Sequence, residues 1–199
     1  PDYAVTGVQT CALPIYDIAV LSDSTEKLST KRDQLLEFRK LVFAEGEILE
    51  NIVKRTLEYF GGKISPAKYA SEEYILEFDG EEYLIEVKGL TKSASLDHVR
   101  QLIDYALEAE QKAHKQIRGI LIANPWRERP LKDRGTTSEP EFTLNGIQRG
   151  SDMNLALVRT RDLLKALQMC MAGKLEGRAV LKNIVTSRGV VNFDDLLWK

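Results

Sequence analysis

Residues Ser71 to Gly89 read S-E-E-Y-I-L-E-F-D-G-E-E-Y-L-I-E-V-K-G, and this stretch decides how the chain is organised. Polar and apolar residues alternate on both sides of Asp79-Gly80, which is a strong signal for a β-hairpin with a two-residue turn. Such a turn places six apolar side chains on one face of the hairpin: Tyr74, Leu76, Phe78, Tyr83, Ile85 and Val87. We therefore expect that face to belong to the core.

The opposite face of the predicted hairpin collects charge at one end. The same register sets Glu73 directly across from Glu86, with Lys88 two residues further along. Opposed like charges destabilise a sheet unless something bridges them, and a divalent cation is a natural bridge. Carboxylate oxygens suit Mg²⁺, so the pair predicts a magnesium site, with Glu72 replacing Glu73 if the turn is longer. A solvated, salt-bridged hairpin surface is the alternative, because short motifs recur by chance.

A carboxylate on one strand, a hairpin turn and then Glu-x-Lys-Gly resembles the PD-(D/E)xK, or restriction-endonuclease-like, nuclease superfamily. The resemblance implies that Glu73, where the family more often has Asp, and Glu86 bind Mg²⁺, with Mn²⁺ as a substitute. It implies that Lys88 orients the attacking water or stabilises charge on the phosphorane. The implied activity is metal-dependent hydrolysis of DNA, by an endonuclease in preference to an exonuclease.

A helix is predicted from Glu47 to about Phe60, where Gly61-Gly62 ends it. Its expected buried stripe is Ile48, Ile52, Val53, Thr56 and Leu57. The segment G-E-I-L-E-N-I-V resembles the first helix of Mrr-like members of the superfamily, in which a Glu completes the metal shell or holds its water. Glu50 matches that position. A surface Glu on an amphipathic helix is the alternative.

Ser95 is a good N-cap for a second helix, from Leu96 to about Lys115. Gln101 and Tyr105 lie one turn apart on it. This Gln-x-x-x-Tyr spacing resembles an element that RecB-like nucleases place beside the active site. The resemblance implies that Gln101 positions the catalytic Lys or the substrate backbone, while Tyr105 packs nearby. His98 is interpreted as a surface residue, because no second His or Cys has metal-ligand spacing.

Gln116 to Asn124 is a continuous apolar run that predicts a buried strand, and the order strand, helix, strand indicates a parallel or mixed α/β sheet. Between Lys112 and Arg134, seven Lys and Arg face two Asp and Glu, although the net charge of the chain is −2. This local excess predicts a phosphate-tracking surface, and a charged loop that caps the sheet is the alternative. The candidates for contacting nucleic acid are Lys92, Arg118, Trp126, Arg127 and Arg129.

Four segments are expected. Val5 to Ile15 resembles the translation of a common sequencing adapter, so residues 1–15 are expected to be an artefact outside the fold, and the natural N-terminus is expected upstream. Residues 16–44 should hold a strand remnant, Tyr16 to Asp23, and a charged helix that could serve a homodimer. Residues 45–172 form the expected nuclease-like domain, a mixed central sheet flanked by helices in the order α-β-β-β-α-β with a further β-α. Residues 173–199 form a C-terminal extension.

Cysteine usage favours a reducing, cytoplasmic setting, because Cys170 is the one credible thiol once Cys11 is set aside with the adapter. No apolar run approaches membrane-spanning length. Besides a DNA nuclease, two hypotheses stay open. One is a catalytically inactive nuclease-like fold that binds DNA or serves assembly. The other is a protein-interaction domain, favoured if the basic surface points away from the carboxylates.

Overall fold

The computed structural model describes residues 15–66, 68, 69 and 74–197, and the chain divides into two compact units, Pro1–Glu37 and Phe38–Lys199. The described part of the first unit is helical, as part of α1 (Ile15–Phe38). The expected strand at Tyr16 to Asp23 was therefore wrong. A strand needs a neighbour for its backbone hydrogen bonds, whereas a helix satisfies them internally. Several apolar side chains of α1 are exposed, and a homodimer through this helix stays a prediction.

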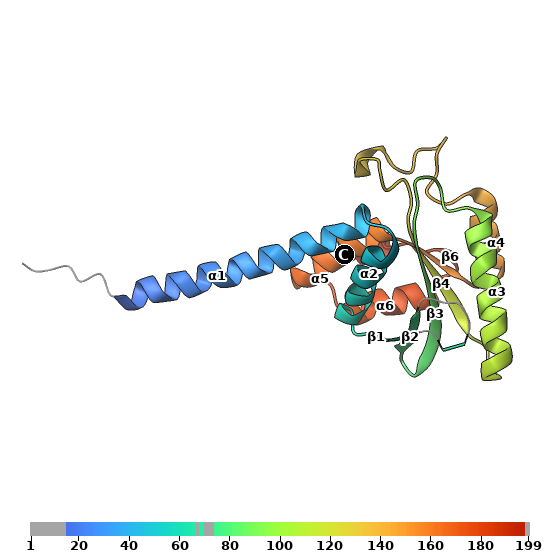
Figure 1. The fold of residues 1–199 in the computed structure, drawn as a ribbon, viewed down its shortest axis with the longest axis horizontal. Helices are drawn as coiled ribbons and strands as arrows, with labels where there is room; N and C mark the ends of the chain where they lie inside the picture. The colour runs from blue at the N-terminus through green and yellow to red at the C-terminus, as the bar shows by residue number, and fades with distance from the viewer. Residues whose placement is uncertain (1–14, 67, 70–73, 198–199) are drawn as a thin grey trace, which may run out of the picture. The chain divides into compact units, whose positions relative to one another are not determined.

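The second unit is built on a six-stranded mixed sheet in the order β1-β2-β3-β4-β5-β6 (Figure 1). The first three strands are antiparallel, whereas β3 to β6 run parallel to one another. Chain order and sheet order coincide, so the helices between the parallel strands act as crossovers. The strands are β1 (Lys63–Pro66), β2 (Tyr74–Phe78), β3 (Glu81–Gly89), β4 (Arg118–Asn124), β5 (Ala156–Arg159) and β6 (Gly189–Val190).

The predicted hairpin is confirmed. Phe78 pairs with Glu81 across the two-residue turn, and both turn residues have positive φ, 53° at Asp79 and 84° at Gly80. Asp and Gly tolerate that left-handed backbone, which matches the twist of the flanking strands. β1 lies at the edge of the sheet, where Pro66 is tolerated because a proline cannot donate a ladder hydrogen bond.

Helices cover both faces of the sheet (Figure 1). One face packs against α2 (Gly46–Tyr59), α5 (Thr160–Met171) and α6 (Gly177–Thr186), and the other against α3 (Leu96–Ala113) and α4 (Leu144–Asp152). Three short helical segments complete the chain: η1 (Arg39–Val42), η2 (Leu131–Asp133) and α7 (Asp194–Leu197). In the described part of the chain, none of the helices is both long and apolar enough to cross a membrane.

One local expectation needs correction. Leu49 lines the buried face of α2 and Ile48 is 59% exposed, because the stripe runs through Leu49, Ile52, Val53, Thr56 and Leu57 at a spacing of three and four. Beyond β5, the short strand β6 pairs with it and ends the sheet. The C-terminal residues therefore add α6 and β6 to the same fold, and α6 buries Val180, Leu181, Ile184 and Val185 in the core on the α2 side.

Candidate active site

Strand β3 carries Glu86 and Lys88 toward α3. The two residues alternate with Ile85 and Val87, which pack on the α2 side, so their side chains leave the opposite face of the sheet. Glu86 is 1% exposed, and its Oε1 lies 2.5 Å from Nζ of Lys88. Burial strengthens this ion pair, because the charges are poorly screened by solvent. The pair lies near the carboxyl end of the strand, where Lys88 directly precedes the last residue, Gly89.

The second predicted metal ligand, Glu73, and its alternative Glu72 lie outside the described residues. The register of β2 with β3 is described as far as Tyr74, which pairs with Ile85. Of the two carboxylates predicted to oppose each other, Glu86 and Glu73, the described residues therefore include Glu86.

Glu50 lies on the other side of the sheet from the Glu86 carboxylate. The Tyr74 hydroxyl donates to Oε2 of Glu50 at 3.4 Å, and Tyr74 packs against the core on the α2 side. Within the described residues, no group of three or more His, Cys, Asp or Glu side chains has metal-binding geometry. The three-carboxylate set of Glu50, Glu73 and Glu86 stays a prediction.

The first half of α3 borders the Glu86–Lys88 pair. Nε2 of Gln101 donates to the Tyr105 hydroxyl at 2.6 Å, so the two residues of the predicted Gln-x-x-x-Tyr element are joined. Both are partly buried, and Tyr105 packs against the same apolar cluster as Leu84 of β3. The helix face that carries them is thereby fixed against the strand that carries Lys88.

His98 is a residue of this site that sequence reasoning treated as surface. The Ser95 backbone N–H donates to Nδ1 of His98 at 3.0 Å, which completes a capping box at the start of α3. Burial, and next the nearby Lys88 ammonium, lower the pKa of His98. The available signal was the Ser-x-x-His spacing, because the third helical position often returns a side chain to the N-cap backbone.

The carboxyl ends of β3, β4 and β5 lie at one edge of the sheet, where ligands bind in open α/β folds. The segment 125–143 spans this edge, and its Arg127 N–H donates to the Leu90 carbonyl at 3.0 Å. A Cβ built at Gly89 would lie 2.6 Å from Cβ of Glu45, at the start of α2. Gly89 therefore makes room for the chain entering α2, which gives this glycine a packing role.

The predicted basic surface divides between the two ends of the sheet. Trp126, Arg127 and Arg129 lie in the segment after β4, at the end where β3 finishes with Lys88 and Gly89. Lys92, in the loop after β3, is exposed at that end too. Part of the predicted surface thus lies on the carboxylate side, which disfavours the protein-interaction hypothesis.

Arg118 lies at the start of β4, opposite Tyr83. Its guanidinium donates to the Asn154 carbonyl at 2.9 and 2.7 Å and to the Ser187 carbonyl at 2.7 Å, and it also contacts the Val185 carbonyl. The guanidinium joins the start of β5 to the end of α6. The structure therefore gives this candidate nucleic-acid contact a role inside the protein, away from the Glu86 end.

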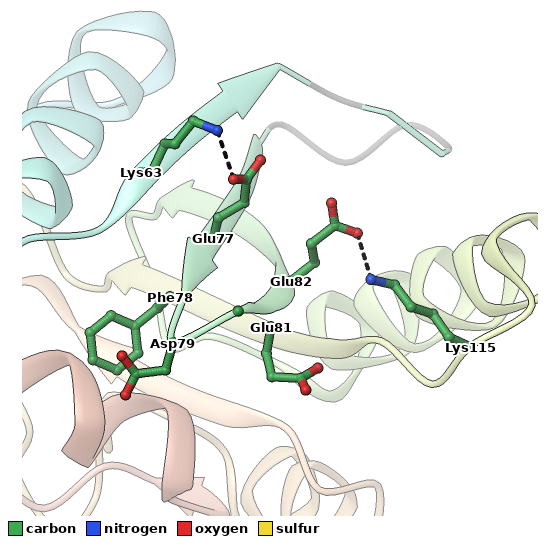
Figure 2. Close-up of a pocket in the computed structure, with 8 residues that line it drawn as sticks. Lys63, Glu77, Phe78, Asp79, Glu81, Glu82 and Lys115 are labelled. Carbon is green, nitrogen blue, oxygen red and sulfur yellow. Dashed lines mark hydrogen bonds and ion pairs between the residues drawn. The ribbon is translucent and has the colours of Figure 1, made fainter.

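The hairpin turn borders a separate polar hollow of about 410 Å³ (Figure 2). Glu77 and Glu82 oppose each other there across the hairpin. Lys63 binds Glu77 at 2.8 Å and Lys115 binds Glu82 at 3.0 Å, and hydrogen bonds, with that of Lys68 the largest effect, lower the pKa of Glu82 to about 2. Lysines thus offset the like-charge repulsion at this end of the hairpin.

Solved structures resemble this chain. The DNA-bound structure of restriction endonuclease FokI matches 78% of this chain and 30% of its own, with a TM-score of 0.51 and 13% sequence identity. The fold is restriction-endonuclease-like. Another FokI structure has a TM-score of 0.49 and 14% identity, over 73% of this chain and 28% of that one. A repair endonuclease from Pyrococcus abyssi has a TM-score of 0.40 and 19% identity, over 55% of this chain and 43% of its own.

This chain spans less than a third of the length of the FokI chains that it matches. No protein-family model matches it, and no curated protein matches its sequence. The likeness therefore concerns the fold, whereas the chemistry depends on the side chains.

Proposed function

We propose that this chain is a Mg²⁺-dependent endonuclease that hydrolyses phosphodiester bonds in DNA. The observation that carries the proposal is the ion pair of the buried Glu86 with Lys88, near the carboxyl end of a central strand that packs against the helix carrying the joined Gln101 and Tyr105. Glu86 is 1% exposed and Lys88 is partly exposed. Holding two charged groups away from solvent costs desolvation free energy, and such an arrangement is typical of functional sites. FokI, whose fold it shares, has been solved bound to DNA, which supports DNA as the substrate.

The donor chemistry of Glu86 fits Mg²⁺, which prefers hard carboxylate oxygens and keeps several waters. Glu86 would hold the ion together with Glu73, whose position in the sequence extends the described register by one residue. Bound Mg²⁺ would supply charge stabilisation and lower the pKa of a bound water. Glu50 would complete the shell only if its carboxylate reaches the Glu86 side of the sheet.

The residues around Glu86 then have distinct roles. Lys88 supplies a compact positive charge beside the reacting phosphate, where charge develops in the transition state. Gln101, held by Tyr105, positions the Lys88 amine or the substrate backbone. Trp126, Arg127 and Lys92 offer contacts to the flanking phosphates from the loops at the same edge.

The test is nicking of covalently closed plasmid in Mg²⁺ by wild type, Glu86→Gln, Lys88→Met and Glu82→Gln. The Glu82→Gln control removes the same group from the same strand and face, but at the hairpin end. We expect nicking to be lost in EDTA and to fall by at least about a hundredfold in the first two variants, because positioned charges contribute on that scale. Nicking by Glu86→Gln at the wild-type rate, or none by wild type, would reject the proposal.

A second candidate function is DNA binding without cleavage. It is favoured by the lack of a three-ligand metal group among the described residues, with Glu86 already paired to Lys88. This reading predicts that wild type retards duplex DNA in a gel while closed plasmid stays intact at every Mg²⁺ concentration. Calorimetric titration of Mg²⁺ into wild type and Glu86→Gln separates the two functions, because only a catalytic site requires binding that Glu86→Gln abolishes.

A further inference from the structure

Arg127 forms an ion pair at the end of the strand that carries Lys88. One guanidinium nitrogen, Nη2, lies 2.6 Å from Oε2 of Glu45, and Nη1 lies 3.1 Å from Oε1 of Glu128. Glu45 adjoins Gly89, and the Arg127 backbone bonds Leu90, so the pair lies just beyond Lys88 along the chain. In the proposed nuclease, the DNA phosphate next to the one being cleaved would lie near the Arg127–Glu45 pair.

The pair is asymmetric in its exposure. The Arg127 side chain is 17% exposed, whereas the side chains of Glu45 and Glu128 are 59% and 65% exposed. Nε of Arg127 is buried and has no hydrogen-bond partner in the described part of the chain. A buried N–H without an acceptor is unfavourable, and exposed carboxylates hold an arginine only weakly. The present partners of Arg127 are therefore exchangeable.

The other arginines of the segment are held more firmly. Arg129 makes two contacts with Glu139 and stacks on Trp126, with Cζ 4.1 Å from the ring centroid. Arg134 is 8% exposed and donates to Asn124, to the Val42 carbonyl and to the carbonyls of residues 127 and 129. Arg127 is thus the arginine of this segment best placed to change partners.

We propose that Glu45 is a built-in competitor for the DNA backbone. Its carboxylate occupies the place on the Arg127 guanidinium that a DNA phosphate takes when substrate binds. A backbone phosphodiester offers the guanidinium one negative charge and two free oxygens, as the carboxylate does. The duplex also presents a row of phosphates and releases condensed counterions on binding, so the exchange is favourable once DNA is present. The inference rests on the proposed function, because it names the residue pair that controls substrate binding at that site.

The experiment measures the Kd of a fluorescent DNA duplex by anisotropy, with Ca²⁺ replacing Mg²⁺. Glu45→Gln is compared with Glu47→Gln. Glu47 lies two residues further along, at an exposed position on α2, so this control removes the same charge. Both changes are repeated in an Arg127→Gln background. We expect Glu45→Gln to bind about fivefold tighter than Glu47→Gln, as loss of a weak competing pair allows, and we expect Arg127→Gln to remove that difference.

The outcomes separate this inference from the proposed function. Equal affinity of Glu45→Gln and Glu47→Gln, in a protein that nicks plasmid, overturns the competitor role and leaves the nuclease standing. A Glu45→Gln gain that persists with Arg127→Gln also overturns it, because the effect would then be one of net charge. Wild type that neither binds duplex at low salt nor nicks plasmid rejects both proposals. Melting temperatures of the variants show whether each is folded.

Discussion

Glu86 and Lys88 form an ion pair within one strand, with the carboxylate side chain 2% exposed and the lysine side chain 26% exposed. The Glu86 carboxylate is thus buried, whereas the Lys88 side chain is partly exposed to solvent. A buried carboxylate depends strongly on nearby positive charge, because desolvation penalises its ionised form. The stability of this fold should therefore respond to whichever cation lies beside Glu86.

Lys88→Met should lower the free energy of unfolding by about 2–4 kcal/mol in EDTA, because it removes the ammonium beside a buried carboxylate. Mg²⁺ should restore part of that loss, and should stabilise the variant more than it stabilises wild type. Urea unfolding with and without Mg²⁺ measures both effects. Lys115→Met is the control, since that side chain is 46% exposed and its pair with Glu82 should matter little. Equal Mg²⁺ responses of all three proteins would contradict the prediction.

Tyr105→Phe should lower kcat for DNA cleavage by about tenfold and leave KM nearly unchanged, because it removes the acceptor that holds Gln101 at 2.6 Å. The free energy of unfolding should change by about 1 kcal/mol or less. Tyr59→Phe, on an exposed face of α2, makes the same chemical change as a control. A loss of stability that accounts for the loss of rate would show a purely structural tyrosine.

His98 should make stability depend on pH. Its pKa is lowered in the folded protein from 6.5, first by burial and then by Lys88. Asp97 and the Ser95 N–H act in the opposite direction with smaller effects. The unfolded chain therefore takes up this proton at a higher pH than the folded one, so the stability is complete above about pH 6.5 and is lost as pH falls below it.

His98→Gln keeps an acceptor for the Ser95 N–H and removes the titration. Between about pH 7.5 and pH 5, the melting temperature of wild type should fall more steeply than that of His98→Gln. Thermal unfolding in matched ionic strength measures the two curves. Parallel curves over this interval would show that the ring does not titrate differently on folding.

Arg118→Met should lower the free energy of unfolding by about 2–4 kcal/mol, because it leaves three backbone carbonyls without a buried donor. The affinity for duplex DNA should stay unchanged, since Arg118 lies at the Tyr83 end of the sheet. Chemical unfolding and anisotropy with the same DNA measure the two quantities. Weaker DNA binding at unchanged stability would show that Arg118 contacts the DNA.

The hairpin could be predicted from sequence because its information is local. Alternation sets which side chains face the core, and Asp79-Gly80 supplies two residues that accept positive φ. The same register placed Glu86 and Lys88 on one face, where the structure pairs them. Glu73 lies outside the described residues, so the opposed carboxylates remain a prediction.

The arginines could not be sorted from sequence because their acceptors are distant along the chain. Arg118 donates to a carbonyl 69 residues away, and Arg134 to one 92 residues away. A local count of charge treats both as available to phosphate. His98 was missed for a related reason, since the usual capping-box partner is Glu or Gln and only the fold brings Lys88 next to the ring.

The hydrogen bond from Arg134 to the Val42 carbonyl has a consequence for the order in which the chain folds. It joins the segment after β4 to η1, 92 residues earlier, and Arg118 joins β4 to residues that are synthesised much later. Contacts of such long range form late in folding. We expect the start of β4 to be fixed in place only after α6 has been synthesised, so the strand that leads to the Arg127 segment gains its last contacts late in folding.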